Sequence, residues 1–257
     1  MISEIKITKL ILEASVKNLL DNLSVDAAIA GAGPSGLVAA KYLSEAGIKV
    51  ALFERKLSTG GGMWGGGMMF PRIVVQKRAK HILDDFKINS CEIEKNYFVA
   101  DSIESVAKLT AGAIDAGANI FNGISVEDVM IRENKICGLV INWSSVEIAK
   151  LHVDPLSIES KFVIDATGHP LEVCKVVQEK VGELNTPSGK IEGEKSMWAE
   201  RAENLVEDNT KEVYPGLFVV GMAANAVYGS PRMGPIFGGM LLSGKKAAEM
   251  IIERLNE

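Results

Sequence analysis

The sequence predicts a Rossmann-like α/β fold with a central parallel sheet and an additional, smaller β-rich lobe. Three observations support this prediction: a glycine-rich turn at residues 31–36 follows an apolar run, a second apolar run at 49–53 completes a β-α-β unit, and a late apolar run at 217–220 precedes a closing helix. Strands that alternate with helices in this way form a parallel sheet covered by helices.

We expect a single dinucleotide-binding domain over residues 1–257. The length and the 47% hydrophobic content are sufficient for one large core. Apolar residues within Ile7–Ala14 follow helical spacing and predict an amphipathic N-terminal helix over 1–22. The region around 90–160 is expected to be an insertion into this domain.

The first β-α-β unit has the clearest local signals. Asp26–Ala30 is a short apolar strand, and the helix that follows is expected over Ser35–Ala46, where Gly47 provides the stop. Lys49–Phe53 is the second strand, which ends at Glu54. The spacing between the two strands is the one that a βαβ unit requires.

The pattern is less regular beyond this unit. Six glycines between Gly60 and Gly67 indicate an irregular loop, and the polar, acid-rich residues 183–212 predict a lid-like connection. The other expected elements are a helix near 77–88, mixed elements near 92–121, a hairpin of strands near 124–131 and 136–142 that turns at Asn134, a strand and excursion over 144–160, a strand at 162–167, a final core strand at 217–220 and a closing helix at 238–255.

Charge and cysteine content exclude several classes of function. The net charge is −5 and the sequence has no long basic run, so nothing indicates a nucleic-acid partner. Cys91, Cys137 and Cys174 are odd in number and form no CxxC pair, which favours a reducing compartment over a disulfide framework. No apolar run approaches the roughly 20 residues that span a bilayer, and no signal peptide is recognisable. We expect a cytoplasmic protein without a membrane partner.

The glycines at 31, 33 and 36 form a GxGxxG loop that is typical of dinucleotide sites. Gly31 permits the tight turn, Gly33 lets the backbone approach a pyrophosphate, and Gly36 lets helix and strand pack closely. The following helix offers free N–H groups and its positive dipole end to the phosphates. The alternative is a tight turn without a ligand.

Three further residues extend this predicted site. Glu54 follows the second strand, about 20 residues after the loop, where a carboxylate accepts hydrogen bonds from both ribose hydroxyls of an adenosine half. Arg55 either pairs with a phosphate or is solvated. Gly62 in the glycine loop either lets the backbone approach a ligand closely or belongs to a flexible linker.

The end of the late strand separates two kinds of dinucleotide. The chain resembles flavoproteins up to Gly221, where a flavin enzyme typically has Gly-Asp and the acid holds the ribityl chain. Here the pair is Gly221-Met222. The missing carboxylate favours an NAD-type ligand on a flavoprotein-type scaffold.

Two of the three histidines lie near acids. His152 and Asp154 are two residues apart, so on a strand they point to the same face. His169 follows the apolar run that ends at Asp165, and α/β folds place ligands just beyond strand ends. An imidazole and a carboxylate that meet there suit a divalent metal such as Fe(II). The alternatives are that His169 caps the next helix and that Asp154 stabilises the turn with Pro155.

Taken together, these segments resemble the thiazole synthases of thiamine biosynthesis, of the eukaryotic and archaeal kind. The resemblance covers nearly the whole chain. It extends over the N-terminal helix, Gly31–Gly36, Glu54-Arg55, the glycine loop, His152–Pro155, Thr167–His169 and Arg232–Pro235.

The resemblance implies a reaction in which NAD is a substrate. NAD loses nicotinamide, condenses with glycine and takes up sulfur, which gives an adenylated thiazole carboxylate. Eukaryotic members donate the sulfur of a cysteine that stands two positions before Asp-Pro; here that position is His152. The resemblance therefore implies the archaeal variant, which is Fe(II)-dependent, uses free sulfide and turns over many times. Family members are homo-octamers whose nucleotide and metal sites are completed by neighbouring subunits.

The family's site residues carry over to matching positions. Asp154 and His169 are the implied iron ligands, and Arg232 is the implied partner of the glycine carboxylate, with a surface-loop arginine as its alternative. His152 either orients the ribose, moves protons or fills the space of the cysteine. The implied NAD contacts are Ser35, Val126, His152, Val153, Asp154 and Met222; ordinary packing is the alternative for Ser35, Val126 and Met222. The implied catalytic residues are His152, Asp154 and His169.

Two other functions remain open at this point. One is an FAD-dependent oxidoreductase on the same scaffold, which would carry a yellow chromophore. The other is a nucleotide-binding or sensing protein without activity, in which Asp154 and His169 would be dispensable for ligand affinity.

Overall fold

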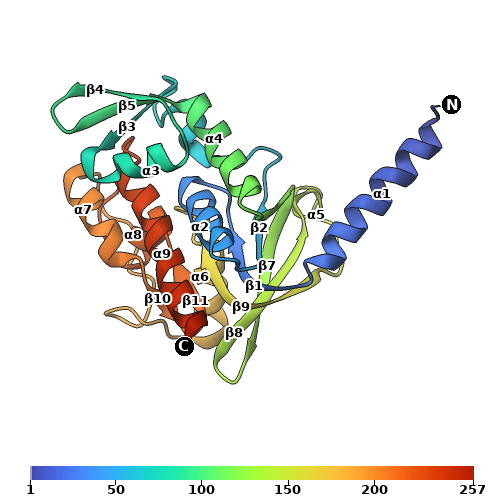
Figure 1. Ribbon diagram of the computed structural model, residues 1–257. Coiled ribbons are helices and arrows are strands. Elements are labelled where there is room, and N and C mark those ends of the chain that lie inside the picture. The colour runs from blue at the N-terminus through green and yellow to red at the C-terminus, as the bar shows by residue number, and fades with distance from the viewer. Residues whose placement is uncertain (1) are drawn as a thin grey trace.

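A mostly parallel sheet forms the centre of the molecule (Figure 1). The computed structural model describes residues 2–257, and within them the sheet has eight strands. In order across the sheet, these are β10 (Glu212–Tyr214), β11 (Leu217–Val219), β9 (Leu156–Asp165), β1 (Ser24–Ala30), β2 (Val50–Glu54) and β6 (Asn119–Asn122), with the hairpin β7 (Ile124–Arg132) and β8 (Lys135–Trp143) joined through β8 to β9.

The register of the central strands brings their carboxyl ends to one edge. Ala30 at the end of β1 is paired with Phe53 of β2 on one side and with Asp165 of β9 on the other. The side chains of β1 from Ala27 to Ala30 are at most 1% exposed, as expected for a strand covered on both faces. The loops that follow β1, β2 and β9 therefore begin side by side, which is where open α/β sheets bind ligands.

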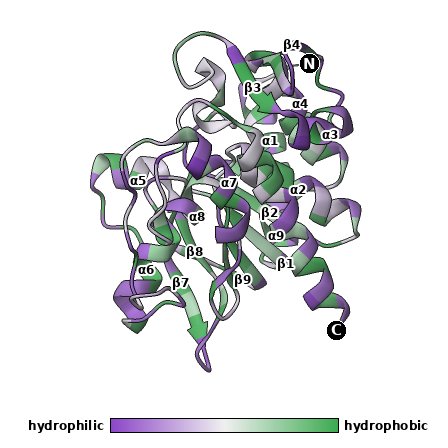
Figure 2. Ribbon diagram, turned by 90° about the vertical axis from the view of Figure 1, so that its left-hand side faces the viewer, coloured by the Kyte–Doolittle hydropathy of each residue, from purple (hydrophilic) through white to green (hydrophobic). Residues whose placement is uncertain are grey.

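Helices cover both faces of the sheet. One apolar core lies beneath α2 (Pro34–Glu45), α4 (Ser102–Asp115) and α9 (Gly238–Asn256), and a second lies beneath α6 (Glu172–Val181) and α8 (Gly221–Val227). Figure 2 shows the hydrophobic residues following the strands of the sheet between these layers. The three-layer arrangement confirms the predicted α/β, Rossmann-like class.

A small antiparallel sheet forms the predicted additional lobe. Its order is β3 (Arg72–Gln76), β5 (Tyr97–Asp101) and β4 (Ser90–Glu94). The predicted helix near 77–88 is shorter than expected, because it consists of the 3₁₀ turn η2 (Lys77–Ala79) and the single short helix α3 (Lys80–Asp85). Asp101 caps α4 by accepting from the N–H groups of Ile103 and Glu104, so the lobe leads directly back into the main domain.

The N-terminal helix α1 (Glu4–Asp21) confirms the prediction for 1–22 but projects away from the body (Figure 1). None of its residues is buried. At helical spacing, Ile7 and Leu10 lie on one side and Leu12 and Val16 on roughly the opposite side, all four about half exposed. No helix of residues 2–257 has the length and apolar character needed to cross a membrane.

Two predictions over the second half of the chain are wrong. Residues 144–160 do not hold a strand and excursion: Trp143 leads into α5 (Ser144–Ala149), residues 151–155 have no regular structure, and β9 then runs unbroken from Leu156. His152 and Asp154 therefore do not share a strand face. Pro155 has no N–H to donate to a strand ladder, which fits a ladder that starts after it.

The polar segment 183–212 is not simply a lid-like connection. It contains α7 (Ala199–Asn209), which packs against α9 and α8. Its inner face holds Ala202 and Val206 together with two polar residues, Glu203 and Asn209. Half of that inner face is polar, so the hydropathy of the segment gives little indication that it is buried.

Glu203 is the most unusual residue of this interface, because its side chain is fully buried. Its Oε1 accepts the N–H of Gly239 in the first turn of α9 at 2.6 Å, and its Oε2 has no hydrogen-bond partner. Burial raises the pKa of this carboxyl from 4.5 to about 7, with opposition from the Gly239 N–H and Arg78.

We expect Glu203→Gln to change the dependence of stability on pH. The pKa of Glu203 is higher in the folded chain than in the unfolded chain, so the protonated acid stabilises the fold relative to the ionised one. This contribution to the free energy of unfolding is fully present below pH 4.5 and is lost as pH rises to about 7. The variant should therefore match the wild type near pH 4.5 and exceed its free energy of unfolding by about 1–3 kcal/mol at pH 8. Urea unfolding at both pH values measures this, with the exposed Glu200→Gln as control; a constant difference between variant and wild type would contradict it.

Candidate functional site

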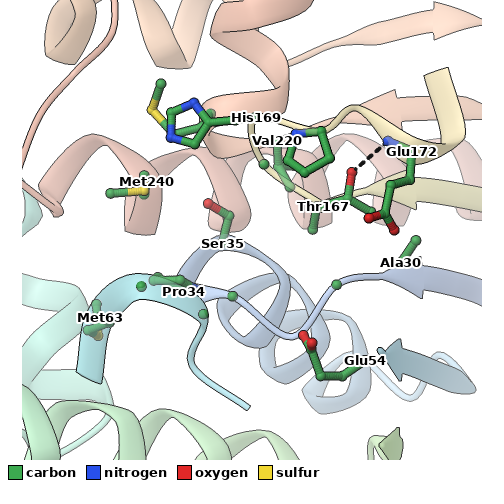
Figure 3. Close-up of a pocket in the computed structure, with 18 of the residues that line it drawn as sticks. Ala30, Pro34, Ser35, Glu54, Met63, Thr167, His169, Glu172, Val220 and Met240 are labelled. Atoms are coloured by element: carbon green, nitrogen blue, oxygen red, sulfur yellow. Dashed lines mark hydrogen bonds between the residues drawn. The ribbon is translucent and has the colours of Figure 1, made fainter. Parts of the chain in front are cut away.

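A cavity of about 730 Å³ opens at the carboxyl edge of the sheet. Figure 3 shows Pro34, Ser35 and Glu54 on one side of it and Thr167 and His169 on the other. Of the residues predicted from sequence, ten line the cavity: Gly31, Gly33, Ser35, Glu54, Arg55, Gly62, Val126, His169, Met222 and Arg232.

The glycine loop after β1 is held by its own backbone. The Gly31 N–H donates to the carbonyl of Phe53 at 2.7 Å, and Gly31 has φ +100°, a conformation that side chains rarely allow. Gly36 lies behind the loop, where an added Cβ would stand 2.1 Å from the Gly31 carbonyl oxygen. Helix α2 begins at Pro34 without a side-chain cap, so its first N–H groups remain available to an anion.

Glu54 braces the same loop in addition to facing the cavity. Its Oε2 accepts the N–H of Ala32 and its Oε1 accepts the N–H of Lys56, both at 2.9 Å. The carboxylate is 7% exposed. Each carboxylate oxygen can accept more than one hydrogen bond, so ribose hydroxyls can still be accepted while the loop is held.

Arg55 has a protein partner that sequence analysis did not find. Its Nη1 forms an ion pair with Glu172 Oε1 at 2.5 Å, and both residues line the cavity. Burial raises the pKa of the Glu172 carboxyl, with opposition from Arg55. The backbone N–H of Glu172 donates to Thr167 Oγ1, the dashed bond in Figure 3. A cation paired in this way is pre-positioned at the cavity wall.

The second glycine segment is not a flexible linker. Gly61–Gly65 forms a 3₁₀ turn, and the N–H of Gly60 donates to the Ala32 carbonyl at 2.7 Å. Gly60 has φ +94°, and a Cβ there would stand 2.4 Å from Val106. The segment therefore packs onto the phosphate loop and forms part of the cavity wall through Gly62.

Arg232 lines the cavity, and backbone bonds fix its main chain. Its N–H donates to the Lys195 carbonyl and its carbonyl accepts the N–H of Trp198, each at 3.0 Å. Met197, next to Trp198, also lines the cavity. The segment before α7, which was predicted to be part of a lid-like connection, thus holds the candidate carboxylate-binding arginine.

His169 has a carboxylate neighbour, and this neighbour is Glu194. The Nδ1 atom lies 2.9 Å from Oε1 and 3.1 Å from Oε2 of Glu194. Asp165 shapes the turn that leads to His169 by accepting from the N–H and the hydroxyl of Thr167. A carboxylate on Nδ1 favours the tautomer in which Nε2 keeps a free lone pair, as in metal-ligating histidines. No sequence motif links Glu194 to His169, because the two meet only in the folded chain.

The other predicted ligands lie elsewhere. His152, Val153 and Asp154 are exposed, do not line the cavity and belong to an irregular segment held by a bond from Asn142 Nδ2 to the Val153 carbonyl at 3.1 Å. Within residues 2–257 of one chain, no group of three or more His, Cys, Asp or Glu side chains is arranged to hold a metal. One chain therefore supplies His169 to the cavity without Asp154.

The model of the Thi4 family matches residues 8–237 of this chain. The chain belongs to the Thi4 family. A curated member, the thiamine thiazole synthase of Methanothermobacter thermautotrophicus, is 60% identical over 255 residues, which cover 99% of each chain.

Solved structures agree with membership of the Thi4 family. The crystal structure of THI4 from Thermovibrio ammonificans is 49% identical and superimposes with a TM-score of 0.96 over 100% of this chain and 99% of that one. A flavin-dependent brominase, Bmp2, is 12% identical with a TM-score of 0.53 over 90% of this chain and 81% of that one. The second likeness concerns the fold alone.

We expect Gly36→Ala to damage the site and Gly62→Ala to leave the fold intact. The first substitution places a Cβ against the Gly31 carbonyl oxygen, whereas a Cβ at Gly62 meets nothing within 4 Å. Overpacking of this kind should lower the free energy of unfolding by about 1–3 kcal/mol, and the Gly62 variant should remain within about 0.5 kcal/mol of the wild type. Chemical unfolding of both variants measures this; equal stabilities would show that the loop yields easily.

Proposed function

We propose that this chain is a thiamine thiazole synthase that converts NAD, glycine and sulfide into an adenylated thiazole carboxylate and releases nicotinamide. The observation that carries the proposal is a single cavity that joins a dinucleotide loop, an acceptor for ribose, a histidine and an arginine. The name of the Methanothermobacter relative supports the same reaction class.

The phosphate loop and Glu54 support NAD as the dinucleotide. The uncapped start of α2 receives the pyrophosphate, and Glu54 accepts from the adenosine ribose. Met222 is 8% exposed and lines the cavity where a flavin enzyme would have an acid. An FAD-dependent oxidoreductase is the competing function, and it is favoured only by the likeness of the scaffold.

Arg232 is the proposed partner of the glycine carboxylate. A planar guanidinium can donate two parallel hydrogen bonds to a carboxylate. Backbone bonds on both sides of Arg232 fix the point on the cavity lining from which its side chain starts.

His169 fits an Fe(II) ligand, since Glu194 occupies its Nδ1 and orients the ring. The second donor, Asp154, would come from a neighbouring copy of the chain. A bound divalent metal would supply Lewis-acid and templating chemistry to the sulfur and glycine-derived groups. Glu194 and Asp165 then act by fixing the direction of the imidazole rather than by touching substrate.

A second copy is also supported by exposed apolar side chains. Helix α1 has no residue buried in its own chain, and Trp143, Ile148, Leu151 and Val153, next to Asp154, are 48%, 81%, 60% and 45% exposed. Apolar surface of this extent marks an interface. The proposed assembly is a homo-oligomer, an octamer by family resemblance, with each metal site shared between subunits.

The sulfur is proposed to come from free sulfide. His152 occupies the position of the donor cysteine, and neither the exposed Cys91, the half-buried Cys137 nor the buried Cys174 lines the cavity. Burial also raises the pKa of the Cys174 thiol well above its ordinary value, which keeps it protonated and unreactive. Without a sacrificial cysteine, the chain is expected to turn over many times.

Anaerobic incubation with NAD, glycine, sulfide and Fe(II) tests the proposal. We expect several equivalents of adenylated thiazole for each chain and an unchanged protein mass, both read by mass spectrometry. Omission of sulfide is the control and should abolish the product. A flavin released on denaturation, without thiazole, would instead establish the oxidoreductase, and a loss of mass from the protein would contradict the external sulfur source.

Mixing of two inactive variants tests the shared metal site. Asp154→Ala and His169→Ala should each abolish product formation but leave NAD binding largely intact. Co-expression of the two should restore activity, because about a quarter of the sites then receive both intact residues. Co-expression of Asp154→Ala with a chain that carries both substitutions is the control and should stay inactive. A mixture as inactive as the single variants would refute the sharing.

A further inference from the structure

Glu203 lies directly behind the wall of the cavity that carries Arg232. It joins α7 to the first turn of α9 through the Gly239 N–H, and the neighbouring residues Phe237 and Met240 both line the cavity. An added Cβ at Gly239 would stand 2.8 Å from Glu203 Oε2, so the carboxylate is in close contact with the helix start. The proposed reaction gives this residue no role.

The wall and Glu203 form one packed unit. Ala202 and Val206, which flank Glu203 on α7, pack with Met222 and Met233, and Met240 contacts the same cluster. Arg232 precedes Met233, so a shift of α7 against α9 moves the residues on both sides of the candidate glycine site. The Phe237 N–H is fixed to the Val74 carbonyl at 3.0 Å, which leaves the α7 contact as the second anchor of this turn.

The charge of Glu203 is only partly neutralised. From η2, Arg78 Nη2 lies 3.9 Å from Oε1, but Arg78 Nη1 is already paired with Glu207 of α7. From α9, the facing groups are the N–H groups of the helix start, and the first turn carries no charged side chain. The resulting pKa of about 7 means that Glu203 changes its charge near neutral pH.

The ionised carboxylate holds the helix start more strongly than the neutral acid. A charged acceptor forms the stronger hydrogen bond with the Gly239 N–H, and it is attracted by the positive end of the α9 dipole. Protonation of Glu203 therefore weakens the anchor of the wall. Above neutral pH, the ionised Glu203 lowers the stability of the fold relative to a neutral side chain. A role in the site is a physical reason for a glutamate at this position despite that loss.

We propose that Glu203 is a positioning residue whose charge holds the start of α9, and with it the Arg232 wall, in the arrangement that binds ligand. Binding in the cavity and ionisation of Glu203 are then coupled, and each favours the other. The proposal relies on the proposed function only for the choice of NAD as the probe.

Calorimetric titration of NAD into wild-type protein and the Glu203→Gln variant at pH 6, 7 and 8 tests the coupling. Wild-type affinity should fall about fivefold or more between pH 8 and pH 6. The variant, neutral at every pH, should bind weakly and lose that part of the pH dependence. Glu200→Gln, on the exposed side of the same helix, is the matched control and should retain the wild-type profile.

Proton release on NAD binding distinguishes the proposed coupling from a purely structural role of Glu203, which would not change it. At pH 7, NAD binding to the wild type should release part of a proton, measured as a difference in binding heat between buffers of different ionisation enthalpy. Glu203→Gln should reduce this release, while Glu200→Gln should not.

The outcomes separate this proposal from the proposed function. An unaltered pH profile and unaltered proton release in Glu203→Gln would overturn the coupling and leave the thiazole synthase intact. Absence of NAD binding to the wild type at every pH would overturn both. If the variant does not fold, absence of proton release from the wild type near pH 7 is sufficient to refute the coupling.

Discussion

The close approach of three backbones at the carboxyl edge of the sheet is the constraint on which the site depends. The loops after β1, β2 and β9 meet where a Cβ on Gly31 would stand 2.5 Å from the Ala166 carbonyl oxygen. Glu54 then ties the loops after β1 and β2 together by accepting the N–H of Ala32 from the first loop and the N–H of Lys56 from the second. With the loop fixed by protein bonds, a dinucleotide meets donors that are already oriented, and its binding requires little ordering.

Local signals in the sequence were sufficient for the part of the fold that holds the nucleotide. The β1-α2-β2 unit was predicted within about two residues at each boundary because apolar runs and glycines mark its ends directly. Helix α7 was missed for the opposite reason: Glu203 and Asn209 on its inner face are polar, and their burial depends on partners distant in sequence. The hairpin that turns at Asn134 was confirmed because its turn signal is local in the sequence.

For the candidate site too, local features were predicted and contacts between distant segments were not. Residues that belong to one loop or strand end, such as Gly31, Glu54 and His169, were placed at the cavity from spacing alone. Contacts between distant segments were not: neither the Arg55–Glu172 pair nor the His169–Glu194 pair has a motif. Asp154 differs from these residues, because it lies in an exposed segment, away from the cavity of its own chain. Its proposed role as a metal ligand depends on contact with a second copy of the chain, which one sequence does not show.

Helix α1 has a consequence for how this protein responds to dilution. Its aliphatic side chains lie on two opposite sides, so one flat surface cannot cover both. Each such side chain contributes about 1.5–3 kcal/mol when it is fully buried, and here that gain comes only from contact with another surface. In the proposed assembly, resistance to heat should then follow mass action and increase with protein concentration, as it does for chains that complete their core by association.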